Sequence, residues 1–321
     1  MHRISPLFAE SVLSLLDVSI FARCYCDDLD CRTWQRESYR ISKHCTLSIH
    51  PEGEGTYEVD RILFQFSHTG EESGIDDFDR KNVLVSVVLS SADFGGRGEN
   101  LFQATVDDAF LHRLKRNLAG RSCGSFDCYL DPKIHGNLMA RLLPAMPLTF
   151  QSFAFDHGSE EAEKFLLETS KNQQIERLRM DGTWPKGPEL KTLLNRILFD
   201  PATRGLFVGA DSCIRFSIEA IESLIECWVD DPQRFTWDVV QFKVPIDFDF
   251  DLLSKQVKFT RSLGNDMDCF SRRLPGGCNT LNVIHFKVDR AIHLAFIRPR
   301  SPIFDFAMTI NKDFITDEHI F

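Results

Sequence analysis

Residues 175–198, IERLRMDGTWPKGPELKTLLNRIL, carry the pattern on which the predicted fold depends. In the first half, Ile175, Leu178 and Met180 are spaced by three and then two residues, which predicts a short strand with one buried face. The second half predicts an amphipathic helix, because its apolar residues recur at helical spacing. These residues are Leu190, Leu193, Leu194, Ile197 and Leu198. The stretch is therefore expected to form a strand, a turn and a helix.

The pattern apolar-x-x-apolar-x-apolar recurs on both sides of this stretch. The further matches are Leu84/Val87/Leu89, Cys128/Leu130, Phe150/Phe153/Phe155, Leu206/Val208, Trp237/Val240/Phe242 and Leu281/Ile284/Phe286. The central positions 128, 153, 178 and 206 are separated by 25, 25 and 28 residues. Leucine-rich repeats have roughly 20–29 residues per unit, so this interval fits them. The outer intervals are longer and require insertions or degenerate repeats.

Helical patterns lie between the predicted strands. One apolar face comprises Ala162, Phe165, Leu166 and Thr169, and another, after a capping Ser217, comprises Ile221, Leu224, Ile225 and Trp228. Strands that alternate with helices favour parallel pairing, with each strand reached through a helix. The C-terminal segment 281–297 instead predicts a hairpin around Asp289 and Arg290, which could cap the last repeat.

The N-terminal residues predict a separate module of short helices. Ser5 is expected to cap the first helix, with Pro6 at its first position. The apolar face of this helix comprises Phe8, Val12, Leu15 and Leu16, and Trp34 begins another helix. Residues 46–50 and 59–66 then predict two strands. The expected domains are a helical module, residues 1–45, and an α/β domain with a C-terminal hairpin, residues 46–321.

Composition narrows the classes of protein to which the chain can belong. With 321 residues, 43% of them hydrophobic, the chain can bury a substantial core. Its net charge of −10 argues against a nucleic-acid partner, and no apolar run approaches the roughly 20 residues of a membrane span. Ten cysteines without a signal peptide indicate free thiols in a reducing compartment, so a cytoplasmic or nuclear location is expected.

Candidate metal and phosphate sites have structural explanations that account for them as well or better. Cys24, Cys26, Cys31 and Cys45, beside His44, could hold zinc, but they lack paired C-x2-C spacing. Asp247, Asp249 and Asp251 lack the glycine of a calcium loop, and their alternation with Phe248 and Phe250 favours a strand. Gly95, Gly96 and Gly98 lack a following G-K-[ST]. No cofactor, metal or catalytic residue is therefore predicted, and the chain is not expected to be an enzyme.

Three further residues have less specific expected roles. Cys123 and Cys128 lie in a strand region and are expected to pack as small apolar side chains. Trp184 follows Asp181-Gly182 at the turn between strand and helix. It either packs as a wedge in that turn or contacts a partner from the rim of the loops, because exposed aromatic side chains favour interfaces.

Several of these segments resemble the large F-box-like protein families that are expanded in nematodes. The resemblance rests on IERLRMDGTWPKG with its leucine-rich helix, on FSIEAIESLIECWVDD, on the opening ISPLFAESVLSLLDVSIFARC with Trp34 downstream, and on CTLSIH. It implies a degenerate F-box that docks a Skp-type adaptor of a cullin–RING ubiquitin ligase. The following repeat region would then bind an unknown protein substrate.

The expected fold is thus α/β: a short N-terminal F-box-like helical module, then a leucine-rich-repeat-like stack of parallel strand–helix units with a C-terminal β-hairpin. The expected function is non-enzymatic protein interaction. Candidate adaptor-docking residues are Phe8, Val12, Leu15, Leu16 and Trp34, and Trp184 is a candidate partner contact. Two alternatives remain open: a repeat scaffold that is independent of any ligase, and a zinc-binding protein or hydrolase.

Overall fold

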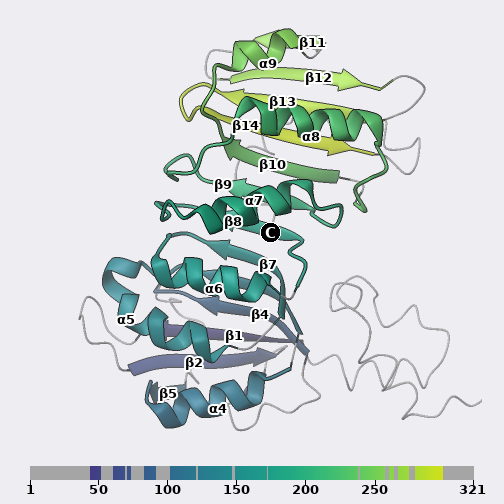
Figure 1. Cartoon of the computed structure of the whole chain (residues 1–321). Helices are drawn as coiled ribbons and strands as arrows, with labels where there is room; N and C mark the ends of the chain where they lie inside the picture. The colour runs from purple at the N-terminus through teal and green to yellow at the C-terminus, as the bar shows by residue number, and fades with distance from the viewer. Residues whose placement is uncertain are drawn as a thin grey trace, which may run out of the picture. The chain divides into compact units, whose positions relative to one another are not determined.

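The computed structural model describes residues 44–51, 61–68, 71–73, 83–91, 102–120, 122–146, 149–171, 173–237, 239–256, 260–263, 267–274 and 279–298. These residues form a mixed α/β fold (Figure 1). The chain divides into two compact units, Met1–Leu193 with Asp211–Cys213 and Leu194–Ala210 with Ile214–Phe321, here called unit 1 and unit 2. The predicted module 1–45 lies outside the described residues, except that His44 and Cys45 begin a strand. The candidate docking residues Phe8, Val12, Leu15, Leu16 and Trp34 also lie outside them.

Unit 1 contains a sheet whose central strands are parallel. Its strands are β1 (His44–Pro51), β2 (Arg61–His68), β3 (Glu71–Ser73), β4 (Val83–Leu89), β5 (Phe102–Thr105), β6 (Ser122–Cys128), β7 (Thr149–Phe155) and β8 (Arg177–Met180). Their order is β8-β7-β6-β4-β1-β2-β3, and β5 pairs with β2. The run from β8 to β1 is parallel, whereas β2 is antiparallel to β1, β3 and β5. The predicted parallel pairing is confirmed for β4, β6, β7 and β8.

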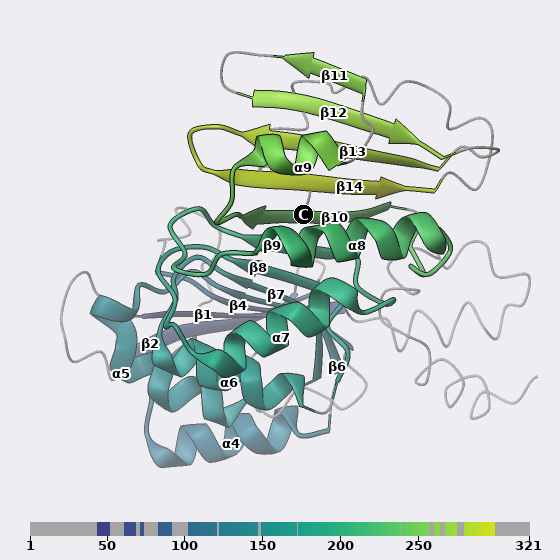
Figure 2. The same ribbon diagram turned by 45° about the horizontal axis from the view of Figure 1, so that its top comes forward.

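Helices connect the parallel strands of unit 1 and cover one face of the sheet (Figures 1 and 2). They are α4 (Asp108–Leu118), α5 (Pro132–Leu142), the short 3-10 helix η2 (Leu143–Ala145) and α6 (Glu160–Ser170). The three α-helices begin after residues whose side chains accept a backbone N–H of the first turn. Asp107 accepts from Phe110, Asp131 accepts from Lys133, and Ser159 accepts from Ala162. These caps fix the residue at which each of the three helices begins.

Phenylalanine rings fill the space between the sheet and the helices of unit 1. Phe126 of β6 lies 5.2 Å from Phe150 of β7 and 4.9 Å from Phe165 of α6, measured between ring centroids. All three are at most 7% exposed. Edge-on and tilted ring pairs at these distances stabilise a core beyond the area that they bury. The expected apolar face of α6 is also confirmed, except that Ser170 rather than Thr169 is buried at its end.

The register of the strands corrects the predicted alignment of the repeats. Phe126 lies opposite Phe153, which lies opposite Leu178, so the equivalent positions are separated by 27 and then 25 residues. The alignment of Cys128 with Phe153 was wrong, because Cys128 lies opposite Phe155. Side chains two residues apart point to the same face of a strand. A slip of two residues therefore leaves the apolar pattern unchanged, and the pattern alone could not detect it.

Unit 2 contains a sheet in which antiparallel pairing predominates. Its strands are β9 (Gly205–Val208), β10 (Val239–Pro245), β11 (Thr260–Leu263), β12 (Met267–Arg273), β13 (Thr280–Phe286) and β14 (Ala291–Ile297). Their order is β11-β12-β13-β14-β10-β9. Only β9 and β10 are parallel among these described strands. The predicted hairpin is confirmed: β13 and β14 pair from Phe286 and Ala291 outward, and Arg290 in the turn has a φ of 47°.

The remaining helices are α7 (Pro188–Phe199), α8 (Ile218–Asp230) and α9 (Phe250–Gln256). The predicted apolar faces of α7 and α8 are confirmed, since every one of their named residues is at most 5% exposed. The predicted strand around Asp247, Asp249 and Asp251 is wrong. The chain bends there, and Asp249 accepts the backbone N–H of Asp251 at 3.0 Å where α9 begins. Phe250 is buried against Phe270, so the helix uses an apolar residue that the alternating pattern had assigned to a strand.

Two other repeat assignments in unit 2 are also corrected. Leu206 lies opposite Phe242 rather than Val240, and Trp237 precedes β10. β13 is not a repeat strand, because both of its neighbours are antiparallel to it. Its buried residues are Leu281 and Val283, whereas Ile284 is only partly buried. An antiparallel strand with one buried face requires only that apolar and polar residues alternate. The match of β13 to the apolar-x-x-apolar-x-apolar pattern is therefore a coincidence.

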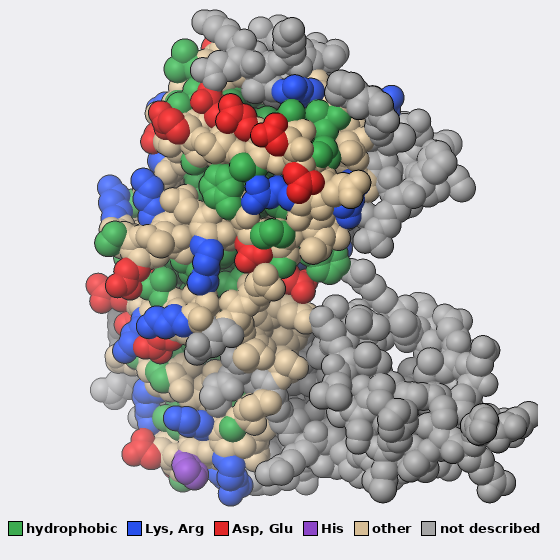
Figure 3. All heavy atoms as spheres, turned by 45° about the vertical axis from the view of Figure 1, so that its right-hand side comes forward, with side chains coloured by type: hydrophobic (Ala, Val, Ile, Leu, Met, Phe, Trp, Pro, Cys, Tyr) green, Lys and Arg blue, Asp and Glu red, His purple; other side chains and the backbone are tan. Residues whose placement is uncertain are grey.

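The face of the molecule drawn in Figure 3 is mixed in charge. It carries Lys and Arg side chains intermixed with Asp and Glu side chains and with apolar ones. Among the described residues, no helix is long and apolar enough to cross a membrane.

Candidate functional site

The candidate site is the face of the unit 1 sheet opposite α4, α5 and α6. Three rows of side chains cross the parallel strands on this face, as the strand register requires. The first row is Thr46, Ser86, Ser125, Ser152 and Arg177; the second is Ser48, Val88, Asp127, Ala154 and Arg179. The third row is His50 near the end of β1 and then Ser90, Tyr129, Asp156 and Asp181, which directly follow β4, β6, β7 and β8. We call these three rows the polar ladder.

Backbone hydrogen bonds hold the third row in register. The N–H groups of Ser90, Tyr129, Asp156 and Asp181 each donate to a carbonyl of the preceding strand in the sheet, at 2.7–3.1 Å. These bonds continue the parallel pairing one residue past the strand ends. These four residues of the third row therefore occupy fixed positions although they begin the loops.

Short polar side chains make up much of the first row. Its hydroxyl groups come from β1, β4, β6 and β7, and Ser86 Oγ donates to Thr46 Oγ1 at 3.4 Å. At the β1 end of the third row, His50 Nδ1 lies 2.9 Å from the carbonyl oxygen of Ser90, and both residues are buried. At the β1 end of the polar ladder, His50 and Ser90 are thus buried in contact with each other. The more accessible and charged residues lie on β6, β7 and β8 or directly after them.

The charged end of the polar ladder consists of Asp127, Tyr129, Asp156, Arg179 and Asp181. Ser125 Oγ donates to Asp127 Oδ2 at 3.0 Å, and Arg179 Nε donates to Asp181 Oδ2 at 2.6 Å. Tyr129 is 39% exposed, which places it among the exposed large hydrophobic side chains of the described part of the chain. An exposed tyrosine beside charged groups is a composition typical of binding surfaces.

Burial makes this end costly to ionise. It raises the pKa of Asp127, an effect opposed by the Ser125 hydrogen bond and the positive charge of Arg179, and reinforced by Asp156. It also raises the pKa of Asp156, which Arg179 opposes and Asp181 reinforces. The buried Oδ1 of Asp156 has no hydrogen-bond partner among the described residues. The carboxylates of this end are therefore only partly compensated by the groups around them.

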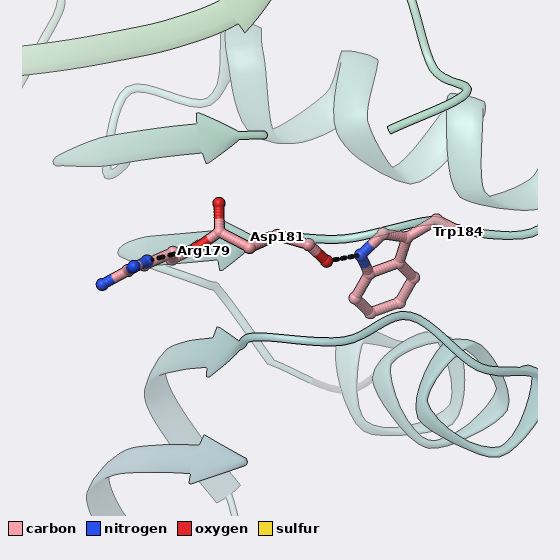
Figure 4. Close-up of polar contacts among 3 residues, drawn as sticks. All are labelled: Arg179, Asp181 and Trp184. Atoms are coloured by element: carbon pink, nitrogen blue, oxygen red, sulfur yellow. Dashed lines mark hydrogen bonds and ion pairs between the residues drawn. The ribbon is translucent and has the colours of Figure 1, made fainter. Parts of the chain in front are cut away.

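Trp184 is buried next to Asp181 of the polar ladder and is not part of an exposed rim. Its side chain is 1% exposed, and its Nε1 donates to the carbonyl oxygen of Asp181 at 2.9 Å. Figure 4 shows that Asp181 thus joins Arg179 through its carboxylate and Trp184 through its backbone. The ring meets Phe155 edge-on, with 5.4 Å between centroids. Packing in the turn is therefore confirmed, and the alternative of an exposed partner contact is wrong.

Two glycines allow the Trp184 turn to close. Gly182 has a φ of 69°, a conformation that side chains with a Cβ rarely adopt. A Cβ on Gly158 would lie 2.3 Å from the Thr183 carbonyl oxygen and 2.7 Å from Trp184 Cγ. The loop after β7 and the loop after β8 are therefore in close backbone contact.

Neither thiol in this part of unit 1 has the character of a nucleophile. Cys123 and Cys128 are each 1% exposed, as expected for small apolar side chains. Burial raises the pKa of both thiols, that of Cys128 to about 12, so the reactive thiolate is disfavoured. They pack in the core beneath the polar ladder.

The other sequence candidates do not form a site in the described residues. Cys24, Cys26 and Cys31, the side chains of His44 and Cys45, and the glycines at 95, 96 and 98 lie outside them. No group of three or more His, Cys, Asp or Glu side chains is placed to hold a metal ion within the described part of the chain.

Sequence reasoning missed the polar ladder because it followed the apolar positions. The signal lies between them: Asp127, Ala154 and Arg179 each stand between the last two apolar residues of their strand. In a parallel stack, those intervening positions share the face without helices. Comparison with known proteins adds no relative: no family model matches the chain, and no curated protein or solved structure has significant similarity to it.

Proposed function

We propose that the chain is a non-enzymatic protein-interaction module that binds its partner through the polar ladder. The observation that carries this proposal is the alignment of mostly polar side chains across five parallel strands, with the 39% exposed Tyr129 in the middle of the third row. A partner can contact several strands at once on such a face, and each strand contributes a side chain at a fixed spacing of about 4.8 Å. Surfaces built in this way bind proteins in many repeat folds.

The finer classification that we propose for unit 1 is a leucine-rich-repeat-like stack. The intervals of 27 and 25 residues between equivalent positions of β6, β7 and β8 support it, as does the capped helix within each connection. The apolar side of each strand is covered by helices, which leaves the intervening positions for recognition.

The resemblance of residues 1–45 to an F-box extends this proposal. In that form, the chain is the substrate-recruiting subunit of a cullin–RING ubiquitin ligase, in the cytoplasm or nucleus, and its N-terminus docks a Skp-type adaptor. A scaffold that is independent of any ligase would share the polar ladder but not the adaptor. The ligase role depends on the resemblance, whereas the binding role depends on the sheet.

A pull-down with a purified Skp-type adaptor tests the ligase role. The full chain should retain the adaptor, and Leu15→Asp combined with Leu16→Asp should lose most of the binding, because it places charges on the predicted apolar face. Leu252→Asp, at a 49% exposed position of α9, serves as the matched control. No retention by the folded wild-type chain would leave the scaffold role.

Site-specific photo-crosslinking tests the binding role separately. A photoreactive side chain at Ser152 of the polar ladder should give a discrete protein adduct in cell extract, whereas the same group at Glu168, exposed on α6, should not. Tyr129→Ala should reduce the Ser152 adduct severalfold, because truncated aromatic anchors weaken interfaces. Equal adducts at both positions would argue against recognition by this face.

A further inference from the structure

The unit 2 sheet has one face on which no described helix lies. Helices α8 and α9 cover its other face (Figure 2), where Trp228 packs against Phe296 and Phe250 packs against Phe270. Strand register assigns the intervening side chains of β9, β10, β12, β13 and β14 to the face without helices. We call it the open face. Its residues are Phe207, Val239, Gln241, Lys243, Met267, Cys269, Ser271, Arg273, Thr280, Asn282, Ile284, Phe286, His293, Ala295 and Ile297.

The open face is apolar and basic, and no Asp or Glu belongs to it. Its charged residues are Lys243 and the exposed Arg273. Lys243 Nζ lies 5.5 Å from the ring centroid of Phe286, a distance at which an aromatic ring attracts a cation. Ile284 and Ile297 are half-buried. Because an antiparallel sheet that faces water commonly carries polar side chains there, this composition instead suits a covering segment that is apolar and acidic.

Residues 303–318 of the same chain, IFDFAMTINKDFITDE, have that composition. They include four acids and one base. Their large apolar residues are Ile303, Phe304, Phe306, Met308, Ile310, Phe314 and Ile315. β14 ends at Ile297, which itself belongs to the open face. The six Cα–Cα steps from Ile297 to Ile303 can span at most about 22 Å, or roughly four strand spacings, so the open face is within reach.

We propose that the open face of unit 2 binds residues 303–318 of the same chain. The apolar side chains of this segment contact Ile284 and Phe286, and its acids lie near Lys243 and Arg273. Burial of apolar surface supplies the attraction, and the charges select the segment. Because the segment is tethered to β14, its effective concentration at the open face is high, which favours the contact. The contact uses a different surface from the polar ladder and does not depend on the proposed function.

Photo-crosslinking within the purified full chain tests the proposal. A photoreactive side chain at Asn282, which lies between Ser271 and Ala295 on the open face, should form adducts with residues 303–318. The same group at Ser223, exposed on α8, should form none. Mass spectrometry of the digested protein maps each adduct. In an equal mixture of ¹⁴N-labelled and ¹⁵N-labelled chains, both halves of an adduct should carry the same label, which identifies a contact within one copy.

Matched charge variants test the basic side of the contact. Lys243→Gln with Arg273→Gln should lower the yield of the Asn282 adduct severalfold. Lys191→Gln with Arg196→Gln removes the same two charges from exposed positions of α7 and should leave the yield unchanged. Thermal unfolding of each variant checks that it is folded.

A second pair of variants tests the apolar side. Phe304→Ser with Phe306→Ser should remove most of the Asn282 adduct, because two large apolar side chains are lost from the segment. Ala307→Ser with Thr309→Ser changes small side chains of the same segment and should preserve the adduct. The wild-type comparison between positions 282 and 223 requires none of these variants.

Several results would overturn the proposal. Asn282 adducts that map outside residues 303–318, or no adducts at all, would show that this segment does not occupy the open face. Adducts that join the two isotope labels equally often would assign the contact to a second copy. Equal yields from Asn282 and Ser223 would show that the segment has no preferred surface. None of these results bears on the polar ladder, so the proposed function is tested separately.

Discussion

Units 1 and 2 use the same apolar alternation to build different sheets. In unit 1, β7 reaches its parallel neighbour β8 through α6. In unit 2, β13 reaches its antiparallel neighbour β14 through residues 287–290 alone. Buried and less buried side chains alternate along β8 in unit 1 and along β10 in unit 2. The connection therefore decides strand direction, because parallel neighbours need a long crossover and antiparallel ones do not.

The largest effect is expected from Trp184→Ala in unit 1. Removing a 1% exposed indole should lower the free energy of unfolding by about 3–5 kcal/mol. It leaves a cavity over Phe155 and removes the bond to the Asp181 carbonyl. Hydrogen exchange measured by mass spectrometry should show faster exchange in β7 and β8 and little change in β13 and β14. Equal acceleration in both units would mean that they unfold together.

Gly158→Ala tests the backbone contact between the loops after β7 and β8. Its Cβ would lie 2.3 Å from a carbonyl oxygen, so we expect destabilisation by about 2–3 kcal/mol. Gly136 of α5 provides the control, because no atom lies within 4 Å of a Cβ placed there. Gly136→Ala should stabilise the chain by up to about 1 kcal/mol, since alanine favours the helix. Chemical denaturation curves of both variants measure the contrast.

Val283→Thr distinguishes the antiparallel register of unit 2 from the repeat pattern. Val283 is fully buried, and a hydroxyl there should cost about 1–2 kcal/mol. Ile284→Thr, at the position favoured by the repeat pattern, changes a half-buried side chain and should cost less. If urea denaturation ranks the two variants in the opposite order, the register of β13 described above is wrong.

Asp127→Asn should give the smallest effect, with a definite dependence on pH. Burial raises the pKa of Asp127 in the folded state, so its contribution to stability is greatest below the unfolded pKa, about 4, and declines as pH rises through the folded pKa. Asparagine removes that decline and can still accept from Ser125. The variant should therefore be more stable than wild type at pH 7, by about 1 kcal/mol or less, because the site is partly solvated. The advantage should shrink near pH 4, as paired thermal melts would reveal.

Sequence reasoning found the elements whose pattern is long and regular. The apolar faces of α7 and α8 could be predicted residue by residue. Apolar residues that keep helical spacing over three turns rarely occur outside an amphipathic helix. The strand containing Leu178 and Met180 was predicted from the spacing of Ile175, Leu178 and Met180, although β8 itself begins only at Arg177. The hairpin around Arg290 was equally clear, since two alternating segments flank a short polar turn.

What could not be predicted depends on contacts across the sheet. Whether Phe126 or Cys128 lies opposite Phe153 is set by hydrogen bonding and ring packing, which leave no trace in the apolar pattern of one strand. The capping role of Asp249 was missed because Phe248 and Phe250 imitate a strand. The polar ladder depends on register too, so its members could be assembled only once the strands were aligned.

The turn at Trp184 has a practical consequence for dissecting the molecule. The indole of Trp184, ten residues before unit 2 begins at Leu194, packs against Phe155. The stretch after β8 therefore covers the end of β7. A fragment that stops at Met180 would expose that phenylalanine to water. Any shortened form of unit 1 meant to fold alone must therefore run past Trp184 and Leu190, well beyond its last strand.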